Sequence, residues 1–460
     1  MRCVSFPAST HRSSPSKVRR FYAALFALVL ATRLCHSGIV WVEEGYALAA
    51  AREMLAGKTL YADIWFDKPP LFPGFYLLFG AMTGVPLRIA GALFVTLSAW
   101  SLGRFARSLW GETEERFAAA ILAFFLTFGI PATVMVIGPD LMLIPLQAAG
   151  VLAAWRGNAL AAGLVAGFGM LINGKMLFLL PACFVARPLW VAGFVAPQLI
   201  LLPVAREYWL EVWAWGMMYS RDTFVTDAFG EGLKRTLNWI GFHVSIAAGA
   251  IFTLRTESNK RRWLLWIALA ALAMIAGFRF FPRYYFLLLP PLVLLAARAA
   301  SCRRWLICLL MIPLIRFGPR YVTLAADLVQ GRPHQWADLA MEQDSRAAAQ
   351  HIRGSLFVWG YRPEIYALAG RPAATMFLDS QPLTGVLADR HLTSSVPTAP
   401  NLAAENRAKL VQSNPDWIVD GLGPYNPKLA ITEFPDLREW LVRYEEVQRT
   451  GGLIVYRRRP

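Results

Sequence analysis

The sequence is poor in charge. Asp, Glu, Lys and Arg together make up 17% of its 460 residues, whereas soluble domains carry about 25%. Hydrophobic residues make up 56%, and many of them fall in long runs. This balance argues against an ordinary soluble protein and indicates a chain that spans a membrane several times.

Cysteine is scarce as well. The five cysteines are Cys3, Cys35, Cys183, Cys302 and Cys308, so the region after residue 308 holds no disulfide. Their spacing does not match a zinc site, and the six histidines form no cluster. The sequence also lacks a dinucleotide-binding fingerprint, a Walker loop and a Gly-x-Ser-x-Gly elbow in a plausible context. These absences argue against the enzyme classes that such motifs mark.

Basic residues outnumber acidic ones by 46 to 30, which gives a formal net charge of +16. Much of the excess lies in short blocks beside apolar runs, at 17–20, 260–262 and 303–304. Cytoplasmic loops of membrane proteins carry such blocks, so we expect a lipid bilayer as partner and no nucleic acid. The basic segment 457–459 does not lie beside an apolar run and stays unexplained at this stage.

The apolar runs predict about ten to thirteen transmembrane helices within residues 21–318, because one helix needs about 20 largely apolar residues. The first run follows a basic arm at 1–20, expected in the cytoplasm. Its length and the lack of a small-residue cleavage site favour a retained helix over a cleaved signal peptide. We expect spans near 21–42, 71–85, 87–103, 117–136, 140–155, 159–172, 174–186, 189–205, 237–254, 263–278, 284–300 and 304–318.

Charge orients the second half of this region. The basic segments 255–262 and 298–304 are expected in the cytoplasm, which places 278–285 and everything after residue 318 on the outer face. Two full spans between 71 and 103 would place the basic segment 104–116 outside, against the positive-inside rule. Either the rule fails there, or one of the two spans is a half-helix or lies in the interface.

Two further regions are expected on the outer face: a Trp-rich segment and a polar C-terminal region. The segment 206–235 is expected to be an amphipathic helix plus loop, because Trp side chains favour the interface. Residues 319–460 alternate helical and β-like stretches, which predicts a small extracytoplasmic α/β domain. Its strands are expected at 356–359, 416–419 and 453–456, and residues 444–456 are expected to form a hairpin with its turn at 450–452.

Residues 43–71 hold the strongest functional signal. This segment gathers ionisable residues between apolar runs, and keeping charge near hydrocarbon is costly. Its order resembles the first extracytoplasmic loop of the GT-C glycosyltransferases, in the bacterial branch related to protein O-mannosyltransferases and the lipid A aminoarabinose transferase. The matching elements are an acidic pair (Glu43, Glu44), Tyr46, a Met-Leu-Ala-Gly turn, Tyr61 and Asp63, and Lys68 followed by Pro-Pro-Leu.

The resemblance implies a base that deprotonates an acceptor hydroxyl. Glu43 falls on the catalytic Asp of the family, with Glu44 beside it and Asp140 as a second acid. Because Glu is one methylene longer than Asp, the base is moved by about 1 Å, a displacement that can change a rate. Without the resemblance, a solvated loop explains the acidic pair better than a catalytic role does, and a helix cap explains Asp140 equally well.

The resemblance also implies cations for the phosphate of a lipid-linked donor. Lys175 lies within an apolar run, where a lysine needs a partner, and Arg283 stands where related sequences often carry His. In isolation, Lys68 is better explained as an interfacial lysine, and Arg279 and Arg283 are equally well explained as interfacial anchors. The alternative for Lys175 is a lysine in a tight outer turn. The phosphate-binding candidates are Lys68, Lys175, Arg279, Arg283, Tyr284 and Tyr285, with Tyr46, Tyr61 and Asp63 as supporting loop residues.

We therefore predict a polytopic α-helical GT-C-type glycosyltransferase of the inner (plasma) membrane. It is expected to move a hexosyl or pentosyl group from a polyprenyl-phosphate donor to the hydroxyl of a glycan, lipid or protein, with inversion. No cofactor is expected to be required; two carboxylates can bind a divalent metal, but the cations favour metal-free transfer. The alternatives are a transporter or flippase of a lipid-linked saccharide, or a membrane scaffold without catalysis.

Overall fold

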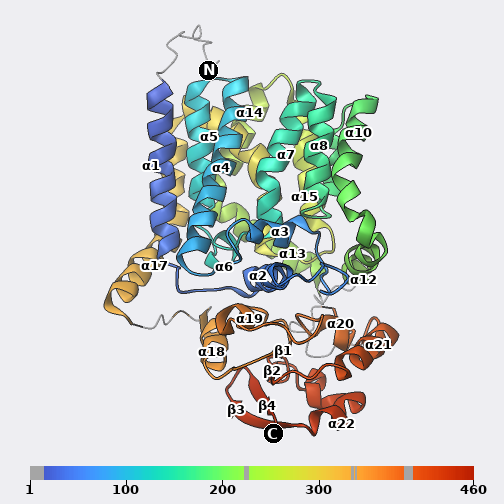
Figure 1. Cartoon of the computed structure of the whole chain (residues 1–460). Helices are drawn as coiled ribbons and strands as arrows, with labels where there is room; N and C mark the ends of the chain where they lie inside the picture. The colour runs from blue at the N-terminus through green and yellow to red at the C-terminus, as the bar shows by residue number, and fades with distance from the viewer. Residues whose placement is uncertain (1–14, 222–226, 333–335, 337–338, 388–396) are drawn as a thin grey trace.

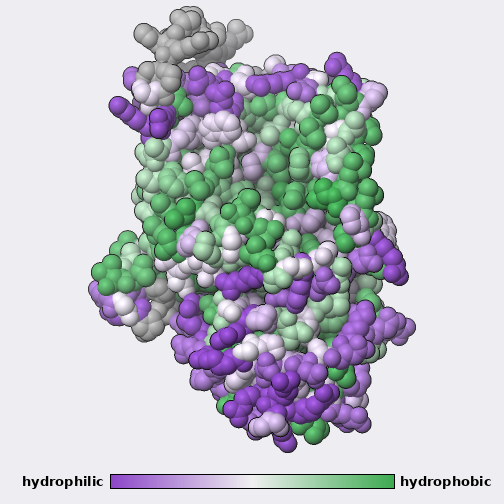
Figure 2. Space-filling view, viewed as in Figure 1, coloured by the Kyte–Doolittle hydropathy of each residue, from purple (hydrophilic) through white to green (hydrophobic). Residues whose placement is uncertain are grey.

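Apolar helices run side by side between two ends of the molecule, and a small domain with a β-sheet lies beyond one end (Figure 1). The computed structural model describes residues 15–221, 227–332, 336, 339–387 and 397–460. Figure 2 shows an apolar band around the helices, a polar rim at the end where α1 begins, and a mostly polar surface on the small domain. This is the surface of an integral membrane protein.

The helical bundle is formed by the elements from α1 to α17. Three of them, α2 (Val42–Leu55), α3 (Leu71–Leu77) and α6 (Pro131–Val134), lie at the end nearest the small domain (Figure 1). The others are α1 (Pro15–Leu34), α4 (Val85–Leu109), α5 (Glu112–Phe125), α7 (Pro139–Trp155), α8 (Ala159–Met170), α9 (Met176–Cys183), α10 (Pro188–Gln198), η1 (Leu199–Val204), α11 (Ala205–Tyr208), the π-helix η2 (Trp209–Ala214), α12 (Trp215–Arg221), α13 (Ala228–Phe242), α14 (Val244–Thr256), α15 (Lys260–Ile275), η3 (Pro282–Leu288), α16 (Leu289–Cys302), η4 (Arg304–Leu310) and α17 (Met311–Gln330).

Fewer helices than predicted are individually long and apolar enough to cross a membrane. Within the described residues these are Val85–Leu109, Pro188–Ser220, Pro282–Cys302 and Arg304–Gln330. A fifth arises if α13 and α14, which meet at 85°, count as one span. The shorter apolar helices α7 and α8 do not reach the required length by themselves. Turns and prolines divide the apolar runs more finely than hydropathy alone indicates.

The predicted span at 71–85 does not exist as a span. Its helix, α3, has seven residues and is about 10 Å long, too short to cross a bilayer. The Tyr22 hydroxyl bonds Glu115, and Arg298 pairs with Glu114, so the segment 104–116 lies at the end where α1 begins and α16 finishes. One of the two segments between 71 and 103 is therefore not a full span, and the basic segments 104–116 and 298–304 lie at one end.

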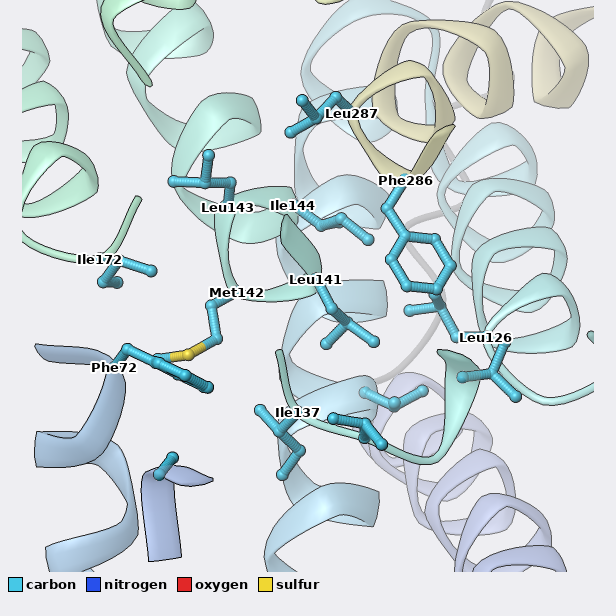
Figure 3. Packing of buried hydrophobic residues seen from close by; sticks show 14 of the residues in the cluster. Phe72, Leu126, Ile137, Leu141, Met142, Leu143, Ile144, Ile172, Phe286 and Leu287 are labelled. Atoms are coloured by element: carbon cyan, nitrogen blue, oxygen red, sulfur yellow. The ribbon is translucent and has the colours of Figure 1, made fainter. Parts of the chain in front are cut away.

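The helix α7 lies at the centre of the bundle. In Figure 3, Met142 points toward Phe72 and Ile172, while Leu141 lies on the side of Phe286. All five side chains are buried. This packing places the first turn of α7 between α3 and η3, so that chain segments far apart in sequence meet around it.

The C-terminal domain contains a four-stranded sheet with strand order β1-β2-β4-β3. The strands β1 and β2 are parallel, whereas β4 is antiparallel to both of its neighbours. The three predicted strands and the hairpin are confirmed, with Thr450 N bonding Leu453 O across the turn. The elements are α18 (Ala340–Ala349), β1 (Leu356–Trp359), α19 (Glu364–Ala369), α20 (Gln381–Thr384), α21 (Pro400–Val411), β2 (Trp417–Asp420), η7 (Pro427–Leu429), η8 (Ile431–Glu433), η9 (Pro435–Leu437), α22 (Arg438–Leu441), β3 (Tyr444–Arg449) and β4 (Ile454–Arg458).

The unexplained basic segment 457–459 finds its place in this sheet. Arg457 pairs with Glu445 on the neighbouring strand β3. Arg458 pairs with Asp416, just before β2, at 2.7 Å. These arginines are therefore cross-strand partners of acidic residues and need no external ligand.

The helix α2 lies between the bundle and the C-terminal domain. Arg52 donates to the carbonyl of Ala367 at 2.9 Å, and Glu53 accepts from the backbone N–H of Ala373 at 2.8 Å. Gly45 faces α19 so closely that an added Cβ would lie 2.5 Å from the Cα of Glu364. The two parts of the protein are thus joined backbone to backbone at the helix that begins with the acidic pair.

Replacing Gly45 with Ala should weaken this junction. The methyl group overlaps the backbone of Glu364, and overpacking of this kind costs about 1–3 kcal/mol. We expect a lower Tm and faster limited proteolysis of the C-terminal domain. The matched control is Gly74→Ala on α3, whose Cβ would meet only a Leu71 side-chain atom at 3.9 Å. If both variants unfold like the wild type, the close approach at Gly45 is dispensable.

Candidate active site

The loop between α2 and α3 is folded by its own side chains. Tyr61 has a φ of 70°, which is unusual for a residue with a side chain, and its hydroxyl donates to the carbonyl of Lys68 at 2.8 Å. Asp63 accepts from the backbone N–H of Thr59 at 2.8 Å. Two prolines then begin α3. Tyr61 and Asp63 therefore shape the loop, as expected for supporting residues, and neither lines the cavity described below.

Tyr46, on α2, contacts the next part of this loop at residues 66–67. Its ring stacks on Phe66 with centroids 4.5 Å apart, and its hydroxyl accepts from the backbone N–H of Asp67 at 3.5 Å. Tyr361, from the C-terminal domain, packs against Tyr46 at 5.6 Å. Burial, followed by the negative charges of Glu43 and Asp67, raises the pKa of Tyr361. The C-terminal domain thus brings a phenol close to the carboxylates of the loop.

A cavity of about 360 Å³ lies where this loop, α7 and η3 meet. Its volume falls in the range of ligand sites. One part is charged and the other is apolar and aromatic. The lining residues are Glu43, Asp67, Lys68, Pro69, Pro139, Asp140, Ile172, Asn173, Gly174, Lys175, Leu177, Phe178, Val212, Trp213, Gly216, Met217, Tyr219, Ser220, Ala276, Gly277, Arg279, Arg283 and Tyr284.

Arg283 joins two carboxylates in the charged part. Its Nη1 is 2.5 Å from Oε2 of Glu43, and its Nε is 3.7 Å from Oδ2 of Asp140. Lys175 contacts the other oxygen of Asp140 at 2.9 Å and lies over the ring of Tyr284. These contacts gather residues from α2, α7, the α8–α9 turn and η3 into one network.

Two further cations complete the charged part. Lys68 Nζ is 2.6 Å from Oδ2 of Asp67. Arg279 stacks on the ring of Tyr219, with its guanidinium carbon 3.3 Å from the ring centroid, and donates to the carbonyl of Tyr219. The cavity therefore brings together four cations and three carboxylates, most of them tied to a side chain of opposite charge or to an aromatic ring.

The position of Glu43 changes its acidity. Burial raises the pKa of its carboxyl group, the nearby charge of Arg283 lowers it, and that of Asp140 raises it, with a net shift upward. A carboxylate with a raised pKa is a stronger base than one in water. Glu43 therefore has both the location and the direction of pKa shift that suit proton abstraction.

Two of the predicted catalytic and phosphate-binding residues lie away from the cavity. Glu44 is fully buried on the other side of α2, where Arg88 holds it at 2.6 Å. Tyr285 turns away from its neighbour Tyr284: its hydroxyl bonds Thr236 at 2.8 Å and its ring stacks on Trp239. The remaining catalytic and phosphate-binding candidates, seven in all, line the cavity: Glu43, Asp140, Lys68, Lys175, Arg279, Arg283 and Tyr284.

Several lining residues were not predicted. Asp67 is in the conspicuous loop but had no role assigned to it, and Asn173 donates to Asp140 at 3.1 Å. Trp213 and Tyr219 come from the long helix Pro188–Ser220, which the Trp content had marked only as interfacial. Its π-helical turn η2 rotates Trp213 toward the cavity, and such turns are frequent at functional sites. The fold, and not the sequence, shows that this helix forms one wall of the cavity.

The carboxylates do not fit a divalent metal well. Arg283 occupies the space between Glu43 and Asp140, where a shared ion would be bound. Asp67 is paired with Lys68. Within the part of the chain that the structure describes, no group of three or more His, Cys, Asp or Glu side chains is arranged to hold a metal.

Comparison with known proteins identifies the fold. No family model matches the chain, and no curated protein matches it. Among solved structures, it is similar to ArnT from Cupriavidus metallidurans bound to undecaprenyl phosphate, with a TM-score of 0.58 and 15% identity over 96% of this chain and 98% of that one. Apo ArnT gives a TM-score of 0.57 with the same identity and coverage.

A second enzyme shows the same architecture less closely. The apo oligosaccharyltransferase of Archaeoglobus fulgidus matches with a TM-score of 0.50 and 12% identity, over 95% of this chain and 74% of that one. At these identities the likeness establishes the fold alone. The chain has the fold of ArnT, in agreement with the fold that the loop resemblance implied, and the match covers 96% of the chain, the C-terminal domain included.

Proposed function

We propose that this protein is a glycosyltransferase that moves a sugar from a polyprenyl-phosphate donor to an acceptor hydroxyl. The observation that carries the proposal is the single cavity in which Glu43, Asp140 and four cations meet beside an apolar wall. A lipid-linked sugar phosphate likewise has a charged part, the phosphate, and an apolar part, the lipid, which match the two parts of the cavity. The ArnT structure of the same fold binds undecaprenyl phosphate, which supports a donor of this class.

The cations would hold the donor phosphate. Lys68, Lys175, Arg279 and Arg283 all line the charged part of the cavity. A phosphate that leaves from the anomeric carbon gains negative charge in the transition state, and preorganised cations stabilise that charge. A guanidinium fork also bonds two phosphate oxygens at once. The isoprenoid chain would lie along the apolar wall that includes Phe178.

Glu43 would act as the base. It takes the proton of the acceptor hydroxyl while the hydroxyl oxygen bonds the anomeric carbon, and the bond from that carbon to the phosphate oxygen breaks with its electron pair. A single displacement of this kind inverts the configuration. Because Arg283 contacts Glu43 at 2.5 Å, the donor phosphate would compete for the guanidinium and leave the carboxylate free to accept the proton.

The same arrangement supports transfer without a metal. Arg283 already supplies positive charge between Glu43 and Asp140, the place where an ion would otherwise compensate them. An arginine keeps its charge at every physiological pH. Arg283 therefore compensates the negative charges of Glu43 and Asp140 without a bound ion.

The distribution of charge supports an orientation. The basic segments 104–116 and 298–304 gather at the end where α1 begins, which the positive-inside rule assigns to the cytoplasm. The cavity and the C-terminal domain lie at the opposite end (Figure 1). Transfer would then take place on the outer side of the plasma membrane, with a glycan, lipid or protein as acceptor.

Loss of the Glu43 carboxylate should abolish transfer. With purified protein and a set of radiolabelled polyprenyl-phosphate sugars, we expect Glu43→Gln to lower turnover by about 10²–10⁴-fold, the usual contribution of a general base. Addition of EDTA should leave wild-type turnover unchanged.

The matched control for this variant is Asp63→Asn, which makes the same chemical change, carboxylate to amide, in the loop that follows α2 and outside the cavity. It should retain activity. Wild-type turnover by Glu43→Gln would remove Glu43 as the base, and movement of labelled lipid across a vesicle membrane without covalent transfer would establish the transporter alternative.

The pH dependence follows from the raised pKa of Glu43. The base works only when ionised, so kcat/KM should fall as the pH drops through this pKa, at a pH above the ordinary value of 4.5. Because the charge of Arg283 lowers the pKa of Glu43, Arg283→Gln should move this acid limb to still higher pH. An acid limb that stays in place in the variant would contradict the assignment.

Filling the apolar side of the cavity should weaken donor binding. Gly216 lines it, and an added Cβ would meet no atom within 4 Å, so the helix accepts a larger residue there. We expect Gly216→Phe to raise the KM for the donor by roughly tenfold, which corresponds to about 1.4 kcal/mol. Gly241→Phe is the control, because Gly241 is equally open but lies outside the cavity. Equal KM values would show that the donor does not use this space.

A further inference from the structure

The acidic residue beside the proposed base is part of a buried ion pair. Arg88 contacts both oxygens of Glu44, at 2.6 and 3.2 Å, and neither side chain is exposed. Glu44 also accepts from the backbone N–H of Trp41 at 3.2 Å, which caps the first turn of α2. Glu43 belongs to that same turn. The orientation of Glu43 is therefore tied to the position of Arg88.

The other donors of Arg88 reach two more chain segments. Its Nε donates to the carbonyl of His36 at 3.1 Å and its Nη2 to that of Ile39 at 2.5 Å, just after α1. Its Nη1 is 3.4 Å from the carbonyl of Met135, which follows α6. One guanidinium thus connects the end of α1, the start of α2 and the segment before α7.

A second arginine strengthens the last of these connections. Arg33 is also buried, and it donates to the carbonyls of Met135 at 2.9 Å and Val134 at 2.6 Å. The chain then runs through Gly138, whose Cβ, if present, would lie 3.7 Å from the carboxyl carbon of Glu43, to Asp140. The same two arginines therefore set the spacing between the segments that carry Glu43 and Asp140.

We propose that Arg88, supported by Arg33, is a positioning residue that fixes the distance between Glu43 and Asp140 and, through it, the place of Arg283. Neither Arg88 nor Arg33 lines the cavity; Arg88 acts on it through the Glu44 carboxylate and through backbone carbonyls, and Arg33 through backbone carbonyls. Hydrogen bonds from a charged donor are stronger than neutral ones, and a misplacement of about 1 Å at a reacting group can cost about 10²-fold in rate. This inference rests on the proposed function, because it assigns the base to Glu43.

The experiment compares a single variant with a charge-neutral pair. Arg88→Met alone leaves Glu44 buried without a cation and should be unstable. In the double variant Arg88→Met, Glu44→Leu both members of this ion pair are removed, and such apolar replacements commonly restore stability. We expect the double variant to have a Tm near that of the wild type and a kcat lower by about 10–100-fold, with the donor KM little changed because all four cavity cations remain.

A second variant leaves both arginines in place. An added Cβ on Gly91 would lie 2.4 Å from Nη1 of Arg33, so Gly91→Ala displaces that guanidinium without removing a charge. It should also lower kcat more than it changes KM. A double variant with wild-type kcat would overturn the inference and leave Arg88 with a purely structural role.

Hydrogen exchange separates this inference from the proposed function. In the full-length double variant, the amides of residues 42–48 and 134–138 should exchange faster than in the wild type, while those of the β-sheet keep their wild-type rates. Unchanged exchange in both segments would refute the positioning role whatever the activity. Active Glu43→Gln with faster exchange in the double variant would instead refute the proposed base and keep the connection between the segments.

Discussion

The contact of Arg283 with Glu43 and Asp140 is the interaction on which the rest of the site depends. Two carboxylates near the apolar interior of a membrane protein repel each other and lose hydration, so each needs a nearby cation. Arg283 supplies it to both, and Lys175 adds a second cation to Asp140. The helices that meet at the cavity are held at the spacing this network requires.

The surrounding structure supports that network from both sides. On the bundle side, α7 packs between α3 and η3 and so places Asp140 near the loop and near Arg283 (Figure 3). On the other side, Tyr46 and Phe66 stack beneath the loop, and Tyr361 from the C-terminal domain joins them. The cavity is thus lined by residues of the helical bundle, and the C-terminal domain packs against the helix and loop beside it.

The sequence predicted which charged side chains would lie together better than it predicted the helices. The order of charged residues from 43 to 285 led to seven residues that the fold gathers in one cavity, because a charge near hydrocarbon is conspicuous in a sequence. Hydropathy overstated the spans, since it does not detect that residues 71–85 turn at Gly80 and Gly84 before α4 begins.

The sequence did not indicate which of two adjacent residues faces the cavity. Glu43 and Glu44 have the same side chain, and only the direction of α2 decides that one faces the cavity and the other faces Arg88. Tyr284 and Tyr285 divide in the same way across η3. The contribution of Trp213 depends on a π-helical turn, for which the sequence has no reliable signal.

The contact between Gly45 and Glu364 has a mechanical consequence. Interfaces built from long side chains can slide, because the side chains change rotamer and repack. At Gly45 the two backbones approach without an intervening side chain, whereas Arg52 bridges α2 and α19 with its side chain. We therefore expect a movement of the C-terminal domain to displace α2, the helix that carries Glu43, along with it.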